Sequence, residues 1–289
     1  MQIAIVTGCS TGIGFATALR LAREGCRVYA TVRSEASGAN LLEAAGDLPL
    51  SLLIVDVDDD ASVADGIASV IAAEGRVDIL VNNAGVAFGG DIEATSIEEF
   101  QSIMNTNAWG TLRCIQAVLP TMRNQASGCI VNVTSIAGRI AAAGQGAYAA
   151  SKFATEAMSE ELATEVAPFG IRVAIIEPGV VVTPIFDKAM ERPIDMESPY
   201  FTITFRTSRL LMAGLANPST PDDVADAIWH AVTTDAPVLR YPVGIDAATL
   251  ATQRAATSDE AWIEGLSTPD DAAWRALMVE WAATEVPPM

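Results

Sequence analysis

The sequence predicts an α/β fold in which a parallel β-sheet is doubly wound, with helices on both of its faces. Over residues 3–177, short runs of β-branched and aliphatic residues alternate with longer segments whose apolar residues recur at helical spacing. The strand-like runs are apolar throughout, as expected for strands that are buried on both faces. Strands of this kind, separated by helices, need right-handed crossovers, which place them in one parallel sheet.

The expected elements follow one another in order along the chain. Strands are expected at residues 3–7, 27–32, 52–57, 79–81, 130–134 and 173–177, with a candidate last strand at 238–243. Helices are expected at about 15–22, 63–71, 97–121, 147–166 and 221–230. Gly25 and Gly75 stand where helix C-caps belong, and Ser96 with Glu99 forms a capping box that opens the third helix.

Nothing in the sequence divides the chain, so residues 1–289 are expected to form a single domain. After Thr183 the alternation of strands and helices is lost, and residues 184–217 gather proline, methionine and aromatic residues. We expect this segment to be an inserted lid. The chain closes with a C-terminal extension over about 245–289, which contains many alanines and several tryptophans and is expected to be irregular.

The composition excludes several classes of function. With 36 acidic and 17 basic side chains the net charge is −19, so nucleic acids and anionic membrane surfaces are not expected as partners. A single histidine, His230, argues against a zinc site or a Ser-His-Asp hydrolase, and no metal is expected. The four cysteines lack CxxC spacing and are expected in the core of a protein from a reducing compartment. No targeting segment and no apolar run of about 18 residues is visible, so the protein is expected to be cytoplasmic.

A glycine-rich turn follows the first expected strand and leads directly into a helix. Gly8 allows the positive φ of a tight turn, while Gly12 and Gly14 lack a Cβ and let a pyrophosphate approach the N–H groups of the helix N-terminus. The alternative is a turn needed only for tight helix packing. We expect the turn to bind a dinucleotide through Gly8, Ser10, Thr11, Gly12, Ile13 and Gly14.

The end of the second expected strand indicates which dinucleotide is bound. An acidic residue there would accept hydrogen bonds from the adenosine ribose of NAD and would repel the 2′-phosphate of NADP. This chain has Val32 at that place and Arg33 beside it, and an arginine can pair with a phosphate. NADP(H) is therefore expected in preference to NAD(H), with a solvated surface charge as the alternative role of Arg33.

More ligand-facing residues are expected where the third and fourth strands end. Asp56 is placed to hydrogen-bond the adenine amino group, with Val57 beneath the ring. Asn83, Ala84 and Gly85 follow the fourth strand, at the carboxyl edge where ligands of such sheets bind. Their small side chains allow the backbone to pass close to the adenosine ribose, although the asparagines are also typical of a plain turn.

Three residues indicate the chemistry. Tyr148 and Lys152 are four positions apart and therefore share one face of the expected helix, and Ser135 stands just after the fifth expected strand. Lys152 and Lys188 are the only lysines in a sequence with many arginines. This choice is consistent with a need for a compact point charge at position 152.

Taken together, these motifs resemble the short-chain dehydrogenase/reductase family over about residues 1–184. The matching residues, in the family's order and spacing, are the Thr-Gly-x3-Gly-x-Gly turn, Asn-Asn-Ala-Gly at 82–85, Asn107, Ser135, Tyr148-x3-Lys152 and Pro178-Gly179. The runs Ala30-Thr31-x-Arg33 and Leu239-Arg240-Tyr241-Pro242 are similar to those of the 17β-hydroxysteroid and retinol dehydrogenase branch. The resemblance implies a Rossmann-type oxidoreductase.

Hydride transfer between a nicotinamide and a carbonyl or secondary alcohol is the implied reaction, with Tyr148 as its acid/base. A phenol with an ordinary pKa near 10 needs a fall of about three pH units, or about 4 kcal/mol, to work at neutral pH. A cation about 4 Å away at an effective dielectric constant of about 20 supplies about 4 kcal/mol. Lys152 together with oxidised nicotinamide is therefore expected to lower the pKa of Tyr148 enough.

The resemblance also implies roles for the neighbours of Tyr148. Ser135 holds the substrate oxygen, Lys152 also binds the nicotinamide ribose, and Asn107 anchors a water next to Lys152. Pro178 and Gly179 form a turn that faces the nicotinamide. Val180 offers backbone groups to the carboxamide of that ring, and Thr183 binds the same amide.

The expected substrate is an apolar alcohol or ketone, such as a steroid, a retinoid or an aromatic ketone. Phe88 and Phe186 are expected to contact it, with Arg139 near the pocket mouth. Arg192, Arg206 and Arg209 are candidates to hold an anionic group if the lid folds inward. The helices at about 97–121 and 147–166 imply a homodimer or homotetramer, because in the family they pair between subunits.

Two other functions stay open on the sequence. One is a non-catalytic dinucleotide sensor, against which the presence of both Tyr148 and Lys152 argues. The other is a ketoreductase of carrier-bound acyl chains, and a net charge of −19 argues against docking of an acidic carrier.

Overall fold

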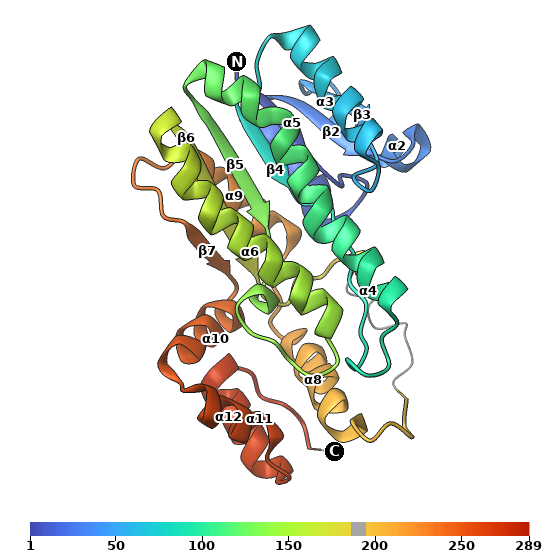
Figure 1. The fold of residues 1–289 in the computed structure, drawn as a ribbon, viewed down its shortest axis with the longest axis vertical. Coiled ribbons are helices and arrows are strands. Elements are labelled where there is room, and N and C mark those ends of the chain that lie inside the picture. The colour runs from blue at the N-terminus through green and yellow to red at the C-terminus, as the bar shows by residue number, and fades with distance from the viewer. Residues whose placement is uncertain (186–194, 289) are drawn as a thin grey trace.

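The computed structural model describes residues 1–185 and 195–288, which adopt the predicted α/β architecture (Figure 1). In the described residues, seven parallel strands form one sheet in the order β3-β2-β1-β4-β5-β6-β7. The strands are β1 (Ile3–Val6), β2 (Arg27–Val32), β3 (Leu50–Ile54), β4 (Ile79–Asn82), β5 (Gly128–Val133), β6 (Ile171–Pro178) and β7 (Arg240–Val243).

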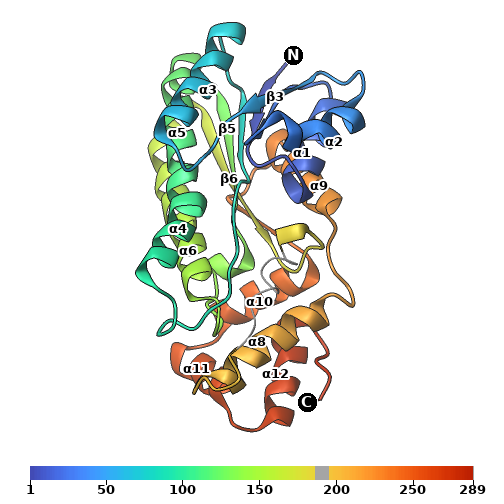
Figure 2. The same ribbon diagram turned by 90° about the vertical axis from the view of Figure 1, so that its right-hand side faces the viewer.

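Helices cover both faces of the sheet, as Figure 2 shows. One layer consists of α1 (Gly12–Arg23), α2 (Glu35–Ala45) and α9 (Pro221–Thr233), and the other of α3 (Asp60–Glu74), α5 (Gly110–Gln125) and α6 (Gly146–Val166). Successive strand residues point to opposite faces, so Ala4 and Val6 pack against the first layer and Ile3 and Ile5 against the second.

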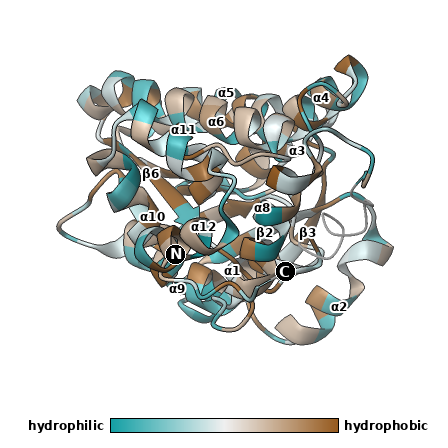
Figure 3. Cartoon of the chain, turned by 90° about the horizontal axis from the view of Figure 1, so that it is seen from below, coloured by the Kyte–Doolittle hydropathy of each residue, from teal (hydrophilic) through white to brown (hydrophobic). Residues whose placement is uncertain are grey.

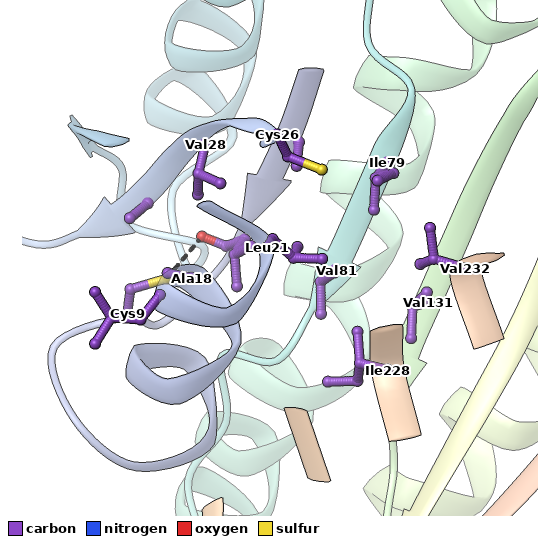
Figure 4. Close-up of a cluster of buried hydrophobic side chains, with 14 of the residues drawn as sticks. Cys9, Ala18, Leu21, Cys26, Val28, Ile79, Val81, Val131, Ile228 and Val232 are labelled. Carbon is purple, nitrogen blue, oxygen red and sulfur yellow. Dashed lines mark hydrogen bonds between the residues drawn. The ribbon is translucent and has the colours of Figure 1, made fainter. Parts of the chain in front are cut away.

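The first layer meets the sheet in a closely packed apolar cluster (Figure 4). Leu21 of α1 and Ile228 of α9 are fully buried there, beside valines of β2, β4 and β5. The chain is coloured mostly brown along its strands and carries teal on its outer helices in Figure 3. All four cysteines are buried and unpaired.

Several element bounds differ from those expected. The third strand, β3, ends at Ile54 instead of residue 57, because the chain then leaves the sheet and the Asp56 N–H donates to Ser62 Oγ (2.9 Å). The capping box at Ser96 opens α4 (Ile97–Met104) as expected. However, the long helix then continues through a π-helical turn, Asn105–Trp109, into α5. Helix α2 was not predicted from the sequence.

The C-terminal extension is helical, so the expectation of an irregular tail is wrong. It forms α10 (Ile245–Ala256), α11 (Asp259–Ser267) and α12 (Asp271–Ala282). Their tryptophans pack into an apolar cluster of their own, in which Trp262 and Trp281 stack with ring centroids 4.5 Å apart. Helix α8 (Phe201–Gly214), in the expected lid, packs on the same cluster through Leu210 and Ala213. Figure 2 shows these helices beneath the carboxyl ends of the strands.

Within the described part of the chain, no helix is long and apolar enough to cross a membrane.

Candidate active site

A cavity of about 830 Å³ opens at the carboxyl ends of the strands, where the strand order reverses between β1 and β4. It brings together residues from the turns after β1 to β6, from α8, and from the C-terminal extension. The predicted residues that line it are Gly8, Ser10, Thr11, Gly12, Ile13, Arg33, Asp56, Val57, Asn83, Ala84, Gly85, Phe88, Ser135, Tyr148, Lys152, Pro178, Gly179, Val180 and Thr183. Gly14 and Asn107 do not line it, and Phe186 lies outside the described residues.

The glycine turn owes its shape to close backbone contacts. Gly8 has φ +71°, and a Cβ at this position would lie 2.8 Å from the Cα of Ala84. The N–H of Gly8 donates to Thr31 Oγ1 (3.1 Å), and Asn83 Nδ2 donates to the carbonyls of Thr7 (2.8 Å) and Gly8 (3.2 Å). The turn after β4 is thereby tied to the turn after β1, so Gly8 serves the turn's geometry.

The other two glycines differ in function from each other. A Cβ at Gly14 would lie 2.4 Å from Asn83 Nδ2, so this glycine is needed for packing, and its expected part in admitting a pyrophosphate stays a prediction. Gly12, with φ +62°, lines the cavity and faces Thr183. Thr11, the N-cap residue of α1, makes no side-chain hydrogen bond to the first turn of its helix. The N-terminus of α1 therefore presents backbone N–H groups and the positive end of its dipole toward the cavity.

The half of the cavity that contains the glycine turn is closed at its far end by residues that follow β2 and β3. Arg33 is exposed, lines the cavity and takes part in no ion pair with the other described residues. Val32 is buried in the first-layer cluster. Asp56 and Val57 lie across from them in the connection between β3 and α3, where Asp56 Oδ1 accepts the N–H of Asp58 (3.1 Å).

Ser135, Tyr148 and Lys152, the three residues that indicated the chemistry, line the opposite half of the cavity. Ser135 follows β5, where its Oγ accepts the Ala137 N–H (3.1 Å). Tyr148 and Lys152 occupy successive turns of α6, with the Lys152 Nζ 5.7 Å from the centroid of the Tyr148 ring. The buried Lys152 Nζ donates to the Val133 carbonyl (3.1 Å), which fixes the ammonium behind the phenol.

Burial dominates the protonation of this group of residues. It raises the pKa of Tyr148, and the neighbouring Ser135 hydroxyl acts in the opposite direction. The expected lowering of the pKa of Tyr148 by Lys152 together with oxidised nicotinamide stays a prediction for the site with nucleotide bound. Burial also lowers the pKa of Lys152 to about 8, against the attraction of Glu156. At neutral pH the site thus holds a protonated phenol beside an ammonium group.

Asn107 lies in the π-helical turn between α4 and α5. Short π-helical turns within α-helices are frequent at functional sites. Its Oδ1 accepts the Val86 N–H (2.8 Å), while its Nδ2 donates to the Val86 carbonyl (2.9 Å) and to Ser151 Oγ (2.9 Å). A Cβ at Gly85 would lie 3.2 Å from Asn107 Oδ1 and 3.7 Å from Lys152 Nζ. Asn107 therefore fixes the segment after β4 beside Lys152, and its contact with a water stays a prediction.

The turn after β6 is occupied differently from what the resemblance implied. The Val180 N–H donates to Asp246 Oδ2 (2.8 Å), and the Val180 carbonyl accepts the Ser219 N–H (3.0 Å). A Cβ at Gly179 would lie 2.2 Å from the same carboxylate. Both backbone groups of Val180 have partners within the chain, although its carbonyl oxygen can accept a second hydrogen bond, so the expected contact of Val180 with a carboxamide stays a prediction.

Sequence reasoning missed Asp246, because α10 was not predicted and an acidic residue in the tail of an acidic protein attracts no notice. It also missed the wall that the lid and the extension build. Ile140, Leu210, Leu211 and Leu250 line this side of the cavity with Gln145, Thr207, Ala282 and Thr284. The sequence pattern of the lid and the extension does not report which helix packs on which.

The two arginines of the expected lid that lie in the described residues, Arg206 and Arg209, do not line the cavity. Arg206 and Arg209 pair with Asp271 of α12, at 3.7 and 2.6 Å, and both guanidinium groups lie over the Trp274 ring. They anchor α8 to the extension instead of holding an anionic substrate. Arg139 pairs with Glu177 (3.1 Å), and Arg192 lies outside the described residues.

The residues of this cavity fit a nicotinamide dinucleotide. The open N-terminus of α1 and Gly12 suit its pyrophosphate, and Gly85 leaves room for a ribose next to Lys152. Such a group, when bound, supplies a ring that donates or accepts hydride. Tyr148, Ser135 and Lys152 line the same cavity as the residues that would hold this group. In the described residues, no group of three or more His, Cys, Asp or Glu side chains is arranged to hold a metal.

Comparisons with known proteins agree with this arrangement. A family model described as short chain dehydrogenase matches residues 2–193. A 3-ketodihydrosphingosine reductase of Bacteroides thetaiotaomicron is 35% identical over 244 residues, which cover 84% of this chain and 88% of that protein. Human 17-beta-hydroxysteroid dehydrogenase type 1 is 35% identical over 252 residues, covering 83% and 76% of the two chains.

Solved structures are similar over most of their length. A short-chain dehydrogenase from Streptomyces avermitilis has a TM-score of 0.77 and 32% identity, and the match covers 97% of this chain and 95% of that one. A metagenomic short-chain oxidoreductase in complex with NADP has a TM-score of 0.67 and 27% identity, with coverage of 84% and 96%.

Proposed function

The chain belongs to the short-chain dehydrogenase/reductase family, whose members are oxidoreductases acting on CH–OH groups, and from this premise we propose an NADP(H)-dependent enzyme for apolar ketones or secondary alcohols. The observation that carries the proposal is one cavity that is lined both by the glycine turn and by Ser135, Tyr148 and Lys152. A dinucleotide held by the turn and a carbonyl held by the three side chains would share that cavity.

In the direction of reduction, Tyr148 gives its proton to the carbonyl oxygen as hydride reaches the carbonyl carbon. Its raised pKa keeps the phenol protonated at neutral pH, which suits this donor role. Ser135 holds the same oxygen through its hydroxyl. The Lys152 ammonium stabilises the phenolate that is left behind.

Replacement of the phenol by phenyl tests this role. Tyr148→Phe removes one oxygen and leaves the ring that packs beside Lys152, so NADPH binding is expected to stay nearly intact while turnover falls at least about a hundredfold. NADPH consumption is measured across ketones graded by size and polarity, and binding by fluorescence titration. Retained turnover in this variant refutes the role of Tyr148.

Preference for NADP(H) is supported by Val32 and Arg33. Val32 leaves no carboxylate where a ribose hydroxyl of NAD would be recognised, and Arg33 is an exposed cation at the cavity without an acidic partner in the described residues. One solved relative, the metagenomic oxidoreductase, is described in complex with NADP.

An apolar substrate is supported by the wall opposite the glycine turn. Isoleucine and leucine side chains from the turn after β5, from α8 and from α10 form most of this part of the lining. The polar side chains among them are Gln145, Thr207 and Thr284. Two relatives are named for substrates of this class, a hydroxysteroid and 3-ketodihydrosphingosine. Phe88 is proposed as a further contact at the mouth of the cavity, where it is 45% exposed.

We propose that the whole chain, residues 1–289, acts as one domain in the cytoplasm. Ile136 and Ile140, which flank the turn after Ser135, pack on the cluster of the C-terminal extension and join it to the sheet. The four buried, unpaired cysteines are compatible with a reducing compartment.

A homodimer or homotetramer is proposed through α4, α5 and α6. In Figure 1, α4 continues into α5, and α6 lies beside this long helix on one outer face. Ile97, Trp109 and Phe153 are large apolar residues exposed on these helices and on the π-helical turn between α4 and α5. Sedimentation at micromolar concentration tests the assembly. A monomer under these conditions contradicts it.

A further inference from the structure

Behind the active-site lysine, a cluster of charged side chains is buried beneath the last strand. Glu156 lies one helical turn after Lys152 on α6, and Glu177 lies near the end of β6. Both carboxylates are almost completely buried, at 4% and 1% exposure. Neither contacts the cavity, and the hydride-transfer scheme above uses neither of them.

Arg240 joins the two carboxylates. Its Nε lies 3.0 Å from Glu156 Oε2 and 3.4 Å from Glu177 Oε1, and its Nη2 lies 2.7 Å from Glu160 Oε2 at the surface. Arg240 stands on β7 in register with Ile175, so it shares a face of the sheet with Glu177 two residues further on. It belongs to the Leu-Arg-Tyr-Pro run that the sequence singled out and that the proposed function has not used.

The cluster is tied to the active site through Glu156. Thr134 Oγ1, just before Ser135, donates to Glu156 Oε1 (2.6 Å). A Cβ at Gly138 would lie 2.9 Å from Glu156 Cγ and 3.2 Å from the Lys152 carbonyl, so the turn after Ser135 packs directly on this stretch of α6. A change at Glu156 is therefore transmitted to Lys152 by charge, and by contact to Thr134 and to the turn after Ser135.

The charges of this region balance when the groups on all the neighbouring elements are considered together. The cations are Lys152, Arg139 and Arg240, and the carboxylates are Glu156, Glu160 and Glu177. Tyr148 is the other titratable group that faces Lys152. Without a nearby carboxylate, the buried ammonium group would be costly to keep charged.

We propose that Arg240 is a positioning residue that keeps Glu156 ionised, and that Glu156 in turn keeps Lys152 in its charged form. Burial and Glu177 both raise the pKa of Glu156, whereas Thr134 and Arg240 lower it. Loss of Arg240 therefore favours protonation of Glu156, and a neutral Glu156 no longer stabilises the ammonium. The inference rests on the proposed function only for its effect on turnover.

The scarcity of lysine makes a direct test practical. With the ε-carbons of lysine labelled by ¹³C, NMR of the full chain shows two side-chain signals, from Lys152 and Lys188, and Lys188→Arg assigns them. The Lys152 signal is expected to titrate near pH 8. In Glu156→Gln, which keeps the shape and an acceptor for Thr134, the midpoint is expected to fall by about one pH unit.

Substitutions at Arg240 separate charge from packing. Arg240→Leu is expected to lower the Lys152 midpoint in the same direction, and Arg240→Lys to restore most of it. The matched control is Arg20→Leu, because Arg20 is similarly exposed and bridges Glu24 and Asp226 far from the cavity. This control is expected to leave the Lys152 midpoint where it is.

A Lys152 midpoint that is unchanged in folded Glu156→Gln protein overturns the inference, even if turnover is lost. This titration needs neither nucleotide nor substrate, so failure of the proposed reaction leaves it decisive. As a second readout, the alkaline limb of kcat/KM is expected to shift down with the midpoint in Glu156→Gln. A uniform loss of activity at every pH, without that shift, would indicate a structural role only.

Discussion

The contact between Asp246 and the turn after β6 can be tested quantitatively. Val180 is 9% exposed, and its N–H donates to Asp246 Oδ2 over 2.8 Å. Asp246→Ala removes the acceptor and leaves this part-buried N–H, at the wall of the cavity, without its partner in the chain. Hydrogen bonds to charged groups contribute about 1.5–3 kcal/mol, and an unpaired buried group costs about 1–3 kcal/mol. We expect the free energy of unfolding to fall by about 2 kcal/mol.

Urea unfolding followed by tryptophan fluorescence measures this loss, because Trp262, Trp274 and Trp281 report on the extension to which Asp246 belongs. The control is Asp259→Ala in the same extension, whose carboxylate is 74% exposed and pairs with Arg254. An exposed pair of this kind contributes about 0.5 kcal/mol. Asp246→Asn, which keeps an acceptor oxygen, is expected to fall between the two. Equal losses in Asp246→Ala and Asp259→Ala would refute the assignment of the Val180 contact.

Three further predictions concern the two halves of the cavity. Val32→Asp combined with Arg33→Ala is expected to reverse the preference from NADP to NAD; an unchanged ratio of the two kcat/KM values contradicts the role of Arg33. Burial lowers the pKa of Lys152 from 10.5 in the unfolded chain to about 8 in the folded chain. Between about pH 8 and 10.5 the unfolded chain therefore binds one proton more than the folded chain, so the free energy of unfolding of the wild type rises with pH over that window. Lys152→Met is therefore expected to be more stable than wild type at pH 7, by up to about 3 kcal/mol, with the difference disappearing by about pH 10.5 in chemical denaturation. Gly8→Ala meets the Ala84 backbone at 2.8 Å, whereas Gly25→Ala, at φ +84°, meets nothing within 4 Å; NADPH affinity is expected to fall only in the former, and equal affinities would count against the contact.

The accuracy of the sequence predictions depended on how local each physical cause was. The central strands, the capping box at Ser96 and the glycine turn were predicted because apolar periodicity, cap hydrogen bonds and positive φ act within a few residues. Tyr148 and Lys152 were placed together because four residues make one helical turn. These local rules also put the cavity at the correct edge of the sheet.

Errors appeared where the cause lies between distant segments. In the chain alone the pKa of Tyr148 is raised by burial, which depends on everything that packs around the phenol, and the pairwise charge arithmetic with Lys152 and oxidised nicotinamide did not include this contribution. The tail was expected to be irregular, although its tryptophans fold three helices around a shared cluster with α8.

The βα order, the glycine turn and the spacing of Tyr148 and Lys152 could be predicted from the amino-acid sequence, since each of these is encoded within one element or its ends. Three pairings required the folded chain: Asp246 with the Val180 N–H, Arg206 and Arg209 with Asp271, and Arg240 with Glu156. These partners are far apart along the chain: 66 positions separate Val180 from Asp246, 62 separate Arg209 from Asp271, and 84 separate Glu156 from Arg240. Their pairing follows from how whole layers pack and from the cost of leaving a buried charge or N–H without a partner.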